Sequence, residues 1–237
     1  MPSSAPAASA PTWRGADQGF TCSRQGVTVT LDPDHPEAGI QITTPSSADR
    51  LLGLDIDAVT RATDHWVRGD DLTAVYEPAD ARRLRATAMW RCLDGADDTA
   101  PAAAWMLVAS AQTALLDSHP QVDVVTRVTA GTIHWGGAPP AGTWQPDPFP
   151  GACAVLLGSP GGRSTLVAVH PDDLRGFTAT AADGRITVRC GLFGNRLEKG
   201  VLLRGRVLAA VGPAAGAAEW GSRLLARFTA APPPLTT

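Results

Sequence analysis

The stretch GFTATAADGRITVRCGLFGNRLEKGVLLRGRV, residues 176–207, consists of short runs of alternating side chains separated by turn dipeptides. The dipeptides are Asp183-Gly184 and Gly194-Asn195, and both suit the tight turns that join antiparallel strands. Apolar and polar residues alternate between the turns, which is typical of a strand that buries one face. The stretch therefore predicts a meander of antiparallel strands.

A hairpin at the second dipeptide would sort its side chains onto two faces. Leu192 would then pair with Leu197 and Val188 with Val201, and a slip of one residue would mix polar and apolar residues on both faces. The opposite face would hold five arginines, one carboxylate and one phenylalanine: Arg185, Arg189, Arg196, Arg204, Arg206, Glu198 and Phe193. We expect these arginines to face water, carboxylates of a neighbouring strand, or an acidic or hydroxyl-rich ligand that guanidinium groups bind.

Two earlier segments show the same strand pattern. Residues 59–78 predict a hairpin that turns at Gly69-Asp70, with Val67 opposite Leu72. Residues 82–92 alternate, with mostly polar side chains at odd positions and apolar side chains at even positions. Each segment thus predicts strands with one face toward a core.

The middle of the chain is also rich in strand signals. Residues 103–116 contain helix-forming residues, but their surroundings favour a strand. Residues 122–135 are rich in β-branched side chains and predict one long strand or a bent pair broken at Gly131. The 16 residues that follow, 136–151, are rich in proline and glycine and predict a long loop, and long loops in compact domains are often functional.

The two ends of the chain differ from this pattern. Residues 1–16 are rich in alanine, proline and serine and predict a disordered tail. Near the C-terminus, apolar side chains at a spacing of four residues predict an amphipathic helix that Pro232 ends: Trp220, Leu224 and Phe228. The predicted fold is an all-β antiparallel sandwich with a short C-terminal helix, formed as one domain by residues 17–237.

The composition narrows the classes of function. Charged residues make up 18% of the 237 residues and the net charge is −3, whereas nucleic-acid-binding proteins usually carry a basic excess. There is no run of 18 apolar residues and no signal-peptide pattern, so we expect neither a membrane span nor export. The four cysteines lie in no zinc or redox motif, which predicts free thiols and a cytoplasmic location. Nucleotide-binding motifs are missing, and we expect no cofactor or metal.

Three residues are candidates for acid/base catalysis. His134 stands directly before the long loop, and His170 opens the run HPDDLR, whose aspartates could orient its ring. Together with Glu198, a histidine on the same sheet face would supply the minimum for proton transfer on a sugar. Each histidine alone is also compatible with a purely structural role.

Tryptophan and arginine are the candidates for ligand binding. Trp135 and Trp144 lie beside or within the long loop, and an indole can stack on a sugar ring or fill a core. The guanidinium groups that would grip a ligand come from the predicted hairpin: Arg189, Arg196, Arg204 and Arg206. The sequence gives no indication of the oligomeric state.

The runs LFGNRLEKGVLLRGRV, residues 192–207, and WVRGDDLTAVYEP, residues 66–78, resemble an uncharacterised group of bacterial β-sandwich proteins. The order of long antiparallel strands after a VRG-type hairpin resembles the galactose-mutarotase-like supersandwich, which includes sugar mutarotases, epimerases and domains of polysaccharide-cleaving enzymes. In that superfamily a histidine and a glutamate on the concave sheet move the protons. The resemblance implies His170 and Glu198 as their counterparts.

Two interpretations follow from these observations. The first is a carbohydrate-related protein that binds a neutral or acidic sugar on an arginine- and tryptophan-lined sheet face, with a mutarotase- or epimerase-like activity as one option. The second is a non-catalytic structural or protein-interaction domain, in which the same side chains only cover a sheet. Whether the catalytic candidates converge in a cleft distinguishes the two.

Overall fold

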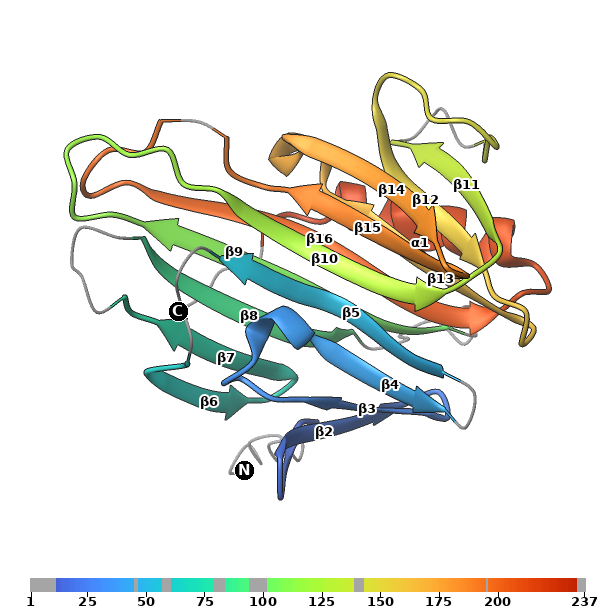
Figure 1. The fold of residues 1–237 in the computed structure, drawn as a ribbon, viewed down its shortest axis with the longest axis horizontal. Helices are drawn as coiled ribbons and strands as arrows, with labels where there is room; N and C mark the ends of the chain where they lie inside the picture. Colours follow the sequence, from blue (N-terminus) through green and yellow to red (C-terminus); the bar gives the residue numbers. More distant parts are fainter. Residues whose placement is uncertain are drawn as a thin grey trace, which may run out of the picture.

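The computed structural model describes residues 12–44, 47–56, 61–78, 84–93, 102–138, 143–194 and 196–233. In this part of the chain, two antiparallel eight-stranded sheets pack face to face, and one α-helix follows near the C-terminus (Figure 1). The predicted all-β sandwich with a short C-terminal helix is therefore confirmed.

Sheet A contains the N-terminal strands and three strands from the middle and C-terminal parts of the chain. Its strands are, in spatial order, β1 (Arg14–Ala16), β2 (Gly19–Arg24), β3 (Val27–Leu31), β4 (Ile40–Thr44), β5 (Ser47–Ile56), β10 (Val122–Thr129), β15 (Arg185–Gly191) and β14 (Gly176–Ala182). A short 3-10 turn, η1 (Pro36–Ala38), connects β3 to β4.

Sheet B contains the other strands and the single helix lies against it. Its strands are, in spatial order, β11 (Thr132–Gly137), β12 (Ala152–Gly158), β13 (Arg163–Val169), β16 (Leu202–Pro213), β9 (Ala103–Gln112), β8 (Arg85–Leu93), β7 (Asp71–Tyr76) and β6 (Asp64–Arg68). A 3-10 turn, η2 (Pro171–Asp173), follows β13, and the helix α1 (Ala217–Ala230) follows β16.

Several local predictions are confirmed. The β6–β7 hairpin turns at Gly69-Asp70 with Val67 opposite Leu72, and the β14–β15 hairpin turns at Asp183-Gly184. The segment that was ambiguous between helix and strand is strand β9. Helix α1 buries Trp220 and Phe228, and it ends at Ala230, shortly before Pro232.

The hairpin predicted at Gly194-Asn195 is wrong. Strand β15 belongs to sheet A, whereas β16 belongs to sheet B, where β13 and β9 occupy both of its edges. Leu197 does not pair with Leu192 but exchanges backbone hydrogen bonds with Ser118. Asn195 itself lies outside the described residues. The alternation on both sides of the dipeptide suits a crossing between sheets as well as a hairpin, because each strand still buries one face.

A second crossing occurs where the sequence predicted a bent strand pair. Strands β10 and β11 are separated at Ala130 and Gly131, as the bent-pair alternative requires, but they lie in different sheets. The backbone N–H of Gly131 donates to the carbonyl of Gly158 on β12 at 2.9 Å. The bend thus carries the chain from sheet A to the edge of sheet B.

Most of the segment that the sequence predicts as a disordered tail, residues 1–16, lies outside the described residues. Residues 1–11 lie outside the described residues, but Thr12 and the residues that follow belong to the sandwich. The Trp13 side chain is 1% exposed, and its indole N–H donates to the carbonyls of Asp70 and Trp90, each at 3.1 Å. Trp13 directly precedes sheet A, whereas its two acceptors lie beside β7 and on β8 of sheet B. The side chain therefore links the start of sheet A to sheet B.

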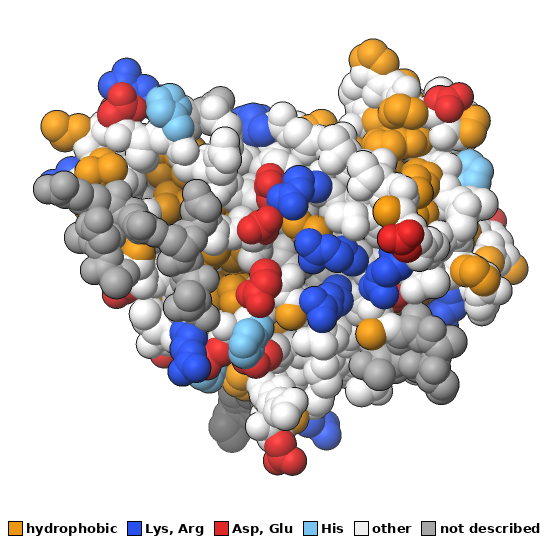
Figure 2. All heavy atoms as spheres, in the orientation of Figure 1, with side chains coloured by type: hydrophobic (Ala, Val, Ile, Leu, Met, Phe, Trp, Pro, Cys, Tyr) orange, Lys and Arg blue, Asp and Glu red, His pale blue; other side chains and the backbone are white. Residues whose placement is uncertain are grey.

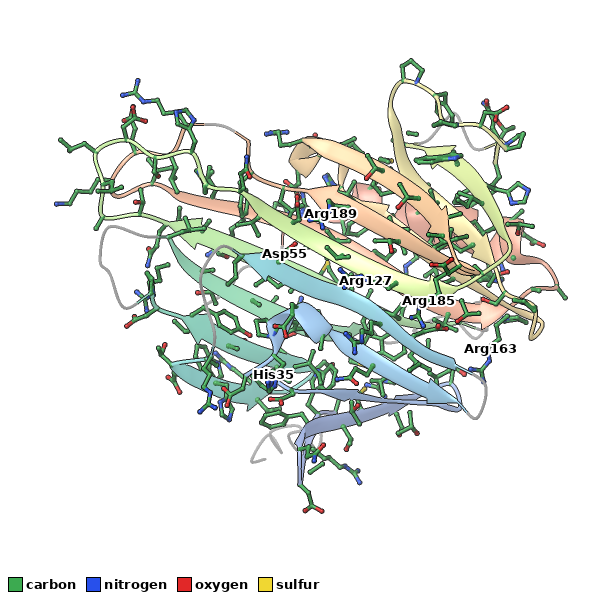
Figure 3. All side chains as sticks on the ribbon, in the orientation of Figure 1. His35, Asp55, Arg127, Arg163, Arg185 and Arg189 are labelled. Atoms are coloured by element: carbon green, nitrogen blue, oxygen red, sulfur yellow. The ribbon has the colours of Figure 1, made fainter. Side chains whose placement is uncertain are left out.

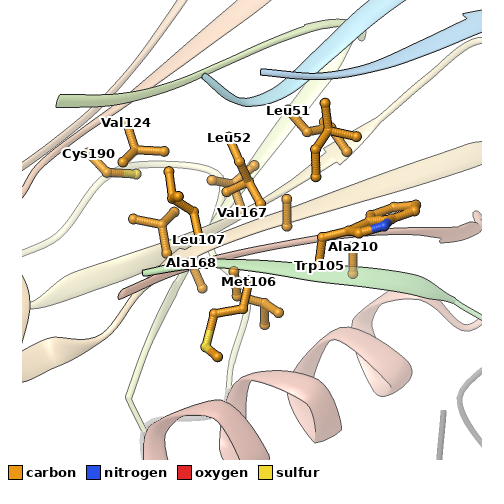
Figure 4. Close-up of a cluster of buried hydrophobic side chains, with 14 of the residues drawn as sticks. Leu51, Leu52, Trp105, Met106, Leu107, Val124, Val167, Ala168, Cys190 and Ala210 are labelled. Atoms are coloured by element: carbon orange, nitrogen blue, oxygen red, sulfur yellow. The ribbon is translucent and has the colours of Figure 1, made fainter. Parts of the chain in front are cut away.

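The core lies between the sheets and consists mainly of aliphatic and tryptophan side chains. Figure 4 shows Leu51, Leu52 and Val124 of sheet A on one side of it and Leu107 of sheet B on the other. Met106 lies on the opposite face of β9, toward α1, because successive side chains of a strand alternate between faces. Sheet B is therefore apolar on both faces where the helix covers it.

Replacing Trp13 by alanine should destabilise the fold strongly. Loss of a fully buried indole costs about 3–5 kcal/mol of unfolding free energy, and here two hydrogen bonds are lost as well. Guanidinium denaturation of the purified chain measures the change. Trp66→Ala is the matched control, because its ring is 44% exposed and its removal should change stability by less than about 0.5 kcal/mol. Equal losses for both variants would contradict the burial of Trp13.

Candidate functional site

The arginines of the predicted hairpin do not share one face, since their strands belong to different sheets. Arg189 lies on the outer face of sheet A together with Arg127 and Arg185 (Figure 3). Its guanidinium binds Asp123 at 2.6 Å and Asp55 at 3.0 Å, and these hydrogen bonds raise the pKa of Arg189. Figure 2 shows basic and acidic side chains close together in the middle of this face. Carboxylates of neighbouring strands thus neutralise the positive charge of Arg189.

Arg206 forms a buried ion pair that holds three elements together. Its side chain is 7% exposed, and its Nε lies 2.8 Å from Oδ2 of Asp173, which also accepts the backbone N–H of Arg206 at 3.0 Å. Its Nη1 donates to the carbonyl of Ala231 at 3.2 Å. Strand β16 is thereby joined to η2 and to the C-terminal end of α1.

His170 belongs to the same structural cluster. The ring is 5% exposed, and its Nδ1 accepts the backbone N–H of Asp172 at 3.3 Å. Its Nε2 lies 3.3 Å from the carbonyl oxygen of Thr229. The ring also packs edge-to-face against Phe228, with centroids 5.6 Å apart. Nε2 therefore contacts the C-terminal end of α1, whereas Nδ1 contacts the backbone of η2.

The three catalytic candidates are not brought together. His134 is exposed on the edge strand β11, and Glu198 is exposed in the segment between β15 and β16. Among the residues that the structure describes, no hydrogen bond joins Glu198 to His134 or His170. The convergence that would have favoured catalysis by these residues is not observed.

Of the two predicted ligand-binding tryptophans, Trp135 is buried and Trp144 is half-buried against α1. Trp135 is 7% exposed and contacts Phe177 of sheet A edge-to-face, with centroids 5.8 Å apart. The Trp144 ring fills the space beside Gly136, where a Cβ would lie 2.6 Å from it. Its indole N–H donates to the Ala218 carbonyl at 3.1 Å and to Ser222 at 3.0 Å, both on α1. Arg196 lies apart from both rings and pairs with Asp117 at 2.7 Å on the surface.

Arg204 is the one predicted site residue that lies in a cavity suited to a ligand. Helix α1 covers the part of sheet B formed by β12, β13 and β16, and the outer face beyond it is open. Here a groove of about 650 Å³ crosses β6, β7, β8, β9 and the start of β16. We call it the sheet B groove, and its lining residues are Trp66, Arg68, Gly69, Asp71, Thr73, Val75, Arg85, Thr87, Met89, Arg91, Val108, Ser110, Gln112, Leu202 and Arg204.

Strand alternation determines which side chains enter the groove. The odd positions of β8 line it, Arg85 and Arg91 among them, while the even positions such as Trp90 are buried in the core. The register of β8 with β9 then places Ser110 opposite Thr87 on the same face. The pattern that the sequence shows over residues 82–92 is thus the pattern of the groove floor.

Positive charge dominates the groove. Four guanidinium groups line it, against a single carboxylate, that of Asp71. Asp71 accepts two hydrogen bonds from Arg91, at 2.6 and 2.7 Å, and these raise the pKa of Arg91. Arg85 pairs with Glu77 at 3.1 Å beside the groove. Arg204 is exposed, and within the described residues no ion pair is recorded for it.

Trp66 gives the groove an exposed aromatic surface. Its indole is 44% exposed and lies on the edge hairpin, opposite Thr73. The sequence places this tryptophan in the predicted hairpin, but sequence reasoning did not select Trp66, Arg85 or Arg91 as ligand-binding residues. All three side chains occupy outward-facing positions on paired strands, and this pattern could have indicated that they share one surface. The groove can therefore offer guanidinium, hydroxyl, amide and aromatic groups to one ligand.

The described part of the chain contains neither a metal-binding cluster nor a membrane-spanning helix. Across the described residues, no group of three or more histidine, cysteine or carboxylate side chains is arranged to hold a metal ion. The helix in this part of the chain is too short and too polar to cross a membrane.

No protein-family model matches the sequence, and no curated protein is significantly similar to it. Solved structures are similar in fold. A heparinase III is similar over 88% of this chain and 36% of its own, with a TM-score of 0.52 and 10% identity. A protein from the human microbiome that is assigned as a kojibiose phosphorylase has a TM-score of 0.46 and 8% identity, over 88% and 35% of the two chains.

A protein of Klebsiella pneumoniae that is assigned as an aldose 1-epimerase has a TM-score of 0.44 and 10% identity, over 89% of this chain and 83% of its own. This chain spans about a third of the length of the heparinase III and of the protein assigned as a phosphorylase. The similarity to the heparinase III agrees with the sandwich fold that the resemblance to the galactose-mutarotase-like superfamily implies. It concerns the fold alone.

Replacing Asp173 by alanine should destabilise the protein by about 3–5 kcal/mol, because it leaves the charge of Arg206 buried without its partner. Urea denaturation measures the loss. Asp117→Ala removes the partner of the exposed Arg196, and we expect less than about 1 kcal/mol from it. An Asp173→Ala protein as stable as Asp117→Ala would show that the Arg206 cluster does not hold α1.

Proposed function

We propose that the protein binds an acidic oligosaccharide in the sheet B groove. The observation that carries this proposal is the combination of the exposed Trp66 indole with Arg204 and three further guanidinium groups along one open sheet face. The groove volume of about 650 Å³ falls within the range of ligand pockets, roughly 300–1,000 Å³. A chain of several sugar rings can lie along such a face.

The chemistry of the lining matches a sugar acid. A guanidinium group binds a carboxylate or sulfate through two parallel hydrogen bonds, and it stays charged at every physiological pH. Thr73, Thr87, Ser110 and Gln112 can exchange hydrogen bonds with sugar hydroxyls. The Trp66 indole provides the flat apolar surface on which a sugar ring can stack. Together these groups favour an anionic, hydroxyl-rich ligand over an apolar one.

The fold also supports a carbohydrate as the ligand. The sandwich is similar to part of a heparinase III, whose name denotes an enzyme of an acidic polysaccharide. An open sheet face on such a sandwich is therefore a reasonable place for a saccharide. The substrate of that enzyme is not transferred to this chain, and the ligand class rests on the groove itself.

The proposal is limited to binding. A mutarotase- or epimerase-like reaction needs a proton donor and a proton acceptor at one sugar. Among the described residues that line the groove there is no histidine, and the only carboxylate, Asp71, already accepts both hydrogen bonds of Arg91. His134, His170 and Glu198 lie elsewhere. Binding of a saccharide without its chemical conversion is the function that fits these contacts.

Arg204→Ala should weaken the binding of tetragalacturonate, a short uronic-acid chain, by about tenfold or more. One charge-assisted hydrogen bond contributes roughly 1.5–3 kcal/mol, which corresponds to a factor of this size. Isothermal titration calorimetry at low salt measures the dissociation constant. Maltotetraose, a neutral chain of the same length, should bind more weakly to the wild type and should not distinguish the two proteins.

Arg196→Ala is the matched control, because it removes an arginine that lies outside the groove and is 60% exposed. This variant should bind tetragalacturonate as the wild type does. Trp66→Ala should weaken the binding of both saccharides, since stacking does not depend on their charge. If neither saccharide binds the wild type, or if Arg196→Ala and Arg204→Ala lose affinity equally, the groove is not a site for acidic sugars and the protein-interaction alternative gains support.

A further inference from the structure

Two cysteines that are distant in the sequence meet in the core. Cys22 lies on β2 in sheet A and Cys92 on β8 in sheet B, and their Sγ atoms are 3.1 Å apart. Each is only 2% exposed. A disulfide bond has an S–S distance of about 2.05 Å, so the two sulfurs need to approach by only about 1 Å. All four cysteines of the chain are free thiols in the structure.

The surroundings of this pair favour an anionic sulfur. Nε of Arg24 donates to Sγ of Cys92 at 3.2 Å, which places a permanent positive charge beside the two sulfurs. The hydrogen bond from Cys92 is the main cause that lowers the pKa of the Cys22 thiol, with smaller contributions from Trp105 and Arg24, while burial and Asp70 act in the opposite direction. Thiolates rather than thiols react with oxidants.

The indole of Trp105 adds a second indication. Its N–H is the one buried side-chain polar atom in the described residues that has no hydrogen-bond partner. Trp105 stands opposite Cys92 in the β8–β9 register. An unpaired buried donor costs free energy, and a negative charge on Cys22 nearby reduces this cost.

The other two cysteines lack these features. Cys153 and Cys190 are buried with no second thiol recorded beside them in the described part of the chain. Burial raises the pKa of Cys153 to about 11 and also raises that of Cys190, so both remain protonated at neutral pH. Cys153 and Cys190 can therefore serve as controls for the Cys22–Cys92 pair.

We propose that Cys22 and Cys92 form a reversible disulfide bond that links sheet A to sheet B covalently. A peroxide is the oxidant of suitable size for a buried pair. The Cys22 thiolate attacks one oxygen of hydrogen peroxide, the O–O bond breaks, and a sulfenic acid forms as hydroxide leaves. The Cys92 sulfur then attacks the Cys22 sulfur and displaces the second hydroxide. The two thiol protons convert both hydroxides to water, so two thiols are oxidised and one peroxide is reduced.

The bond would close the end of the sandwich where the N-terminal segment is attached. Trp13 already bridges this end through its hydrogen bond to the Trp90 carbonyl, two residues before Cys92. Cys92 also directly follows Arg91, which lines the sheet B groove. Cross-linking residues 70 positions apart restricts the unfolded chain, and the oxidised protein should therefore be the more stable form.

The test compares the full chain after treatment with hydrogen peroxide and after treatment with dithiothreitol. Each sample is denatured, alkylated with N-ethylmaleimide, digested and analysed by mass spectrometry. We expect a peptide pair joined through Cys22 and Cys92 in the peroxide sample, its loss in dithiothreitol, and alkylated Cys153 and Cys190 in both. The melting temperature of the oxidised protein should exceed that of the reduced protein by about 5–10 °C.

Variants separate this bond from general oxidation. Cys153→Ala should keep the redox-dependent shift of the melting temperature, and Cys92→Ser should lose it. If Cys92→Ser does not fold, the joined peptides of the wild type decide the question. Separate alkylation of Cys22 and Cys92 after peroxide treatment, sulfenic or sulfinic acid without a cross-link, or a bond to Cys153 or Cys190 would each overturn the proposal.

Discussion

The inner faces of the two sheets must bury each other's aliphatic and tryptophan side chains, and strand alternation then decides which residues stay outside. Once Trp90 points into the core, its neighbour Arg91 has to point away from it. The same rule places Arg189 on the outer face of sheet A and Arg204 on the outer face of sheet B, so arginines that are close in sequence end on opposite sides of the molecule. The polar surfaces are thus a consequence of the core.

The outer face of sheet B is divided between a covered half and an open half. Helix α1 covers one half, and its C-terminal end is fixed by the Asp173–Arg206 ion pair and by the Thr229 contact of His170. Trp144 donates its indole N–H to the N-terminal part of the helix. Arg206 contacts the C-terminal end of the helix, and Arg204, two residues earlier on β16, lines the groove. Residues that resemble catalytic or sugar-binding groups in the sequence are used here to hold the helix.

Local structure could be predicted from the sequence where one segment contains all the information. The β6–β7 hairpin and the alternation of β8 depend on neighbouring residues, and both predictions are correct. The Gly194-Asn195 turn failed because a hairpin and a crossing between sheets require the same alternation. The role of His170 depends on Thr229, 59 residues away, and that of Cys22 on Cys92, 70 residues away. The groove likewise needs the pairing of β6 to β9 with β16, which no single segment encodes.

Hydrogen–deuterium exchange of the full chain with and without tetragalacturonate tests the account most directly, because the two arginine-rich faces lie on different sheets. The saccharide should slow exchange in β7, β8, β9 and the first half of β16, which form the sheet B groove. Exchange in β5, β10 and β15, which present Arg127, Arg185 and Arg189, should stay unchanged. Protection confined to these three strands, or no protection at a saturating concentration, would contradict the assignment of the groove as the binding site.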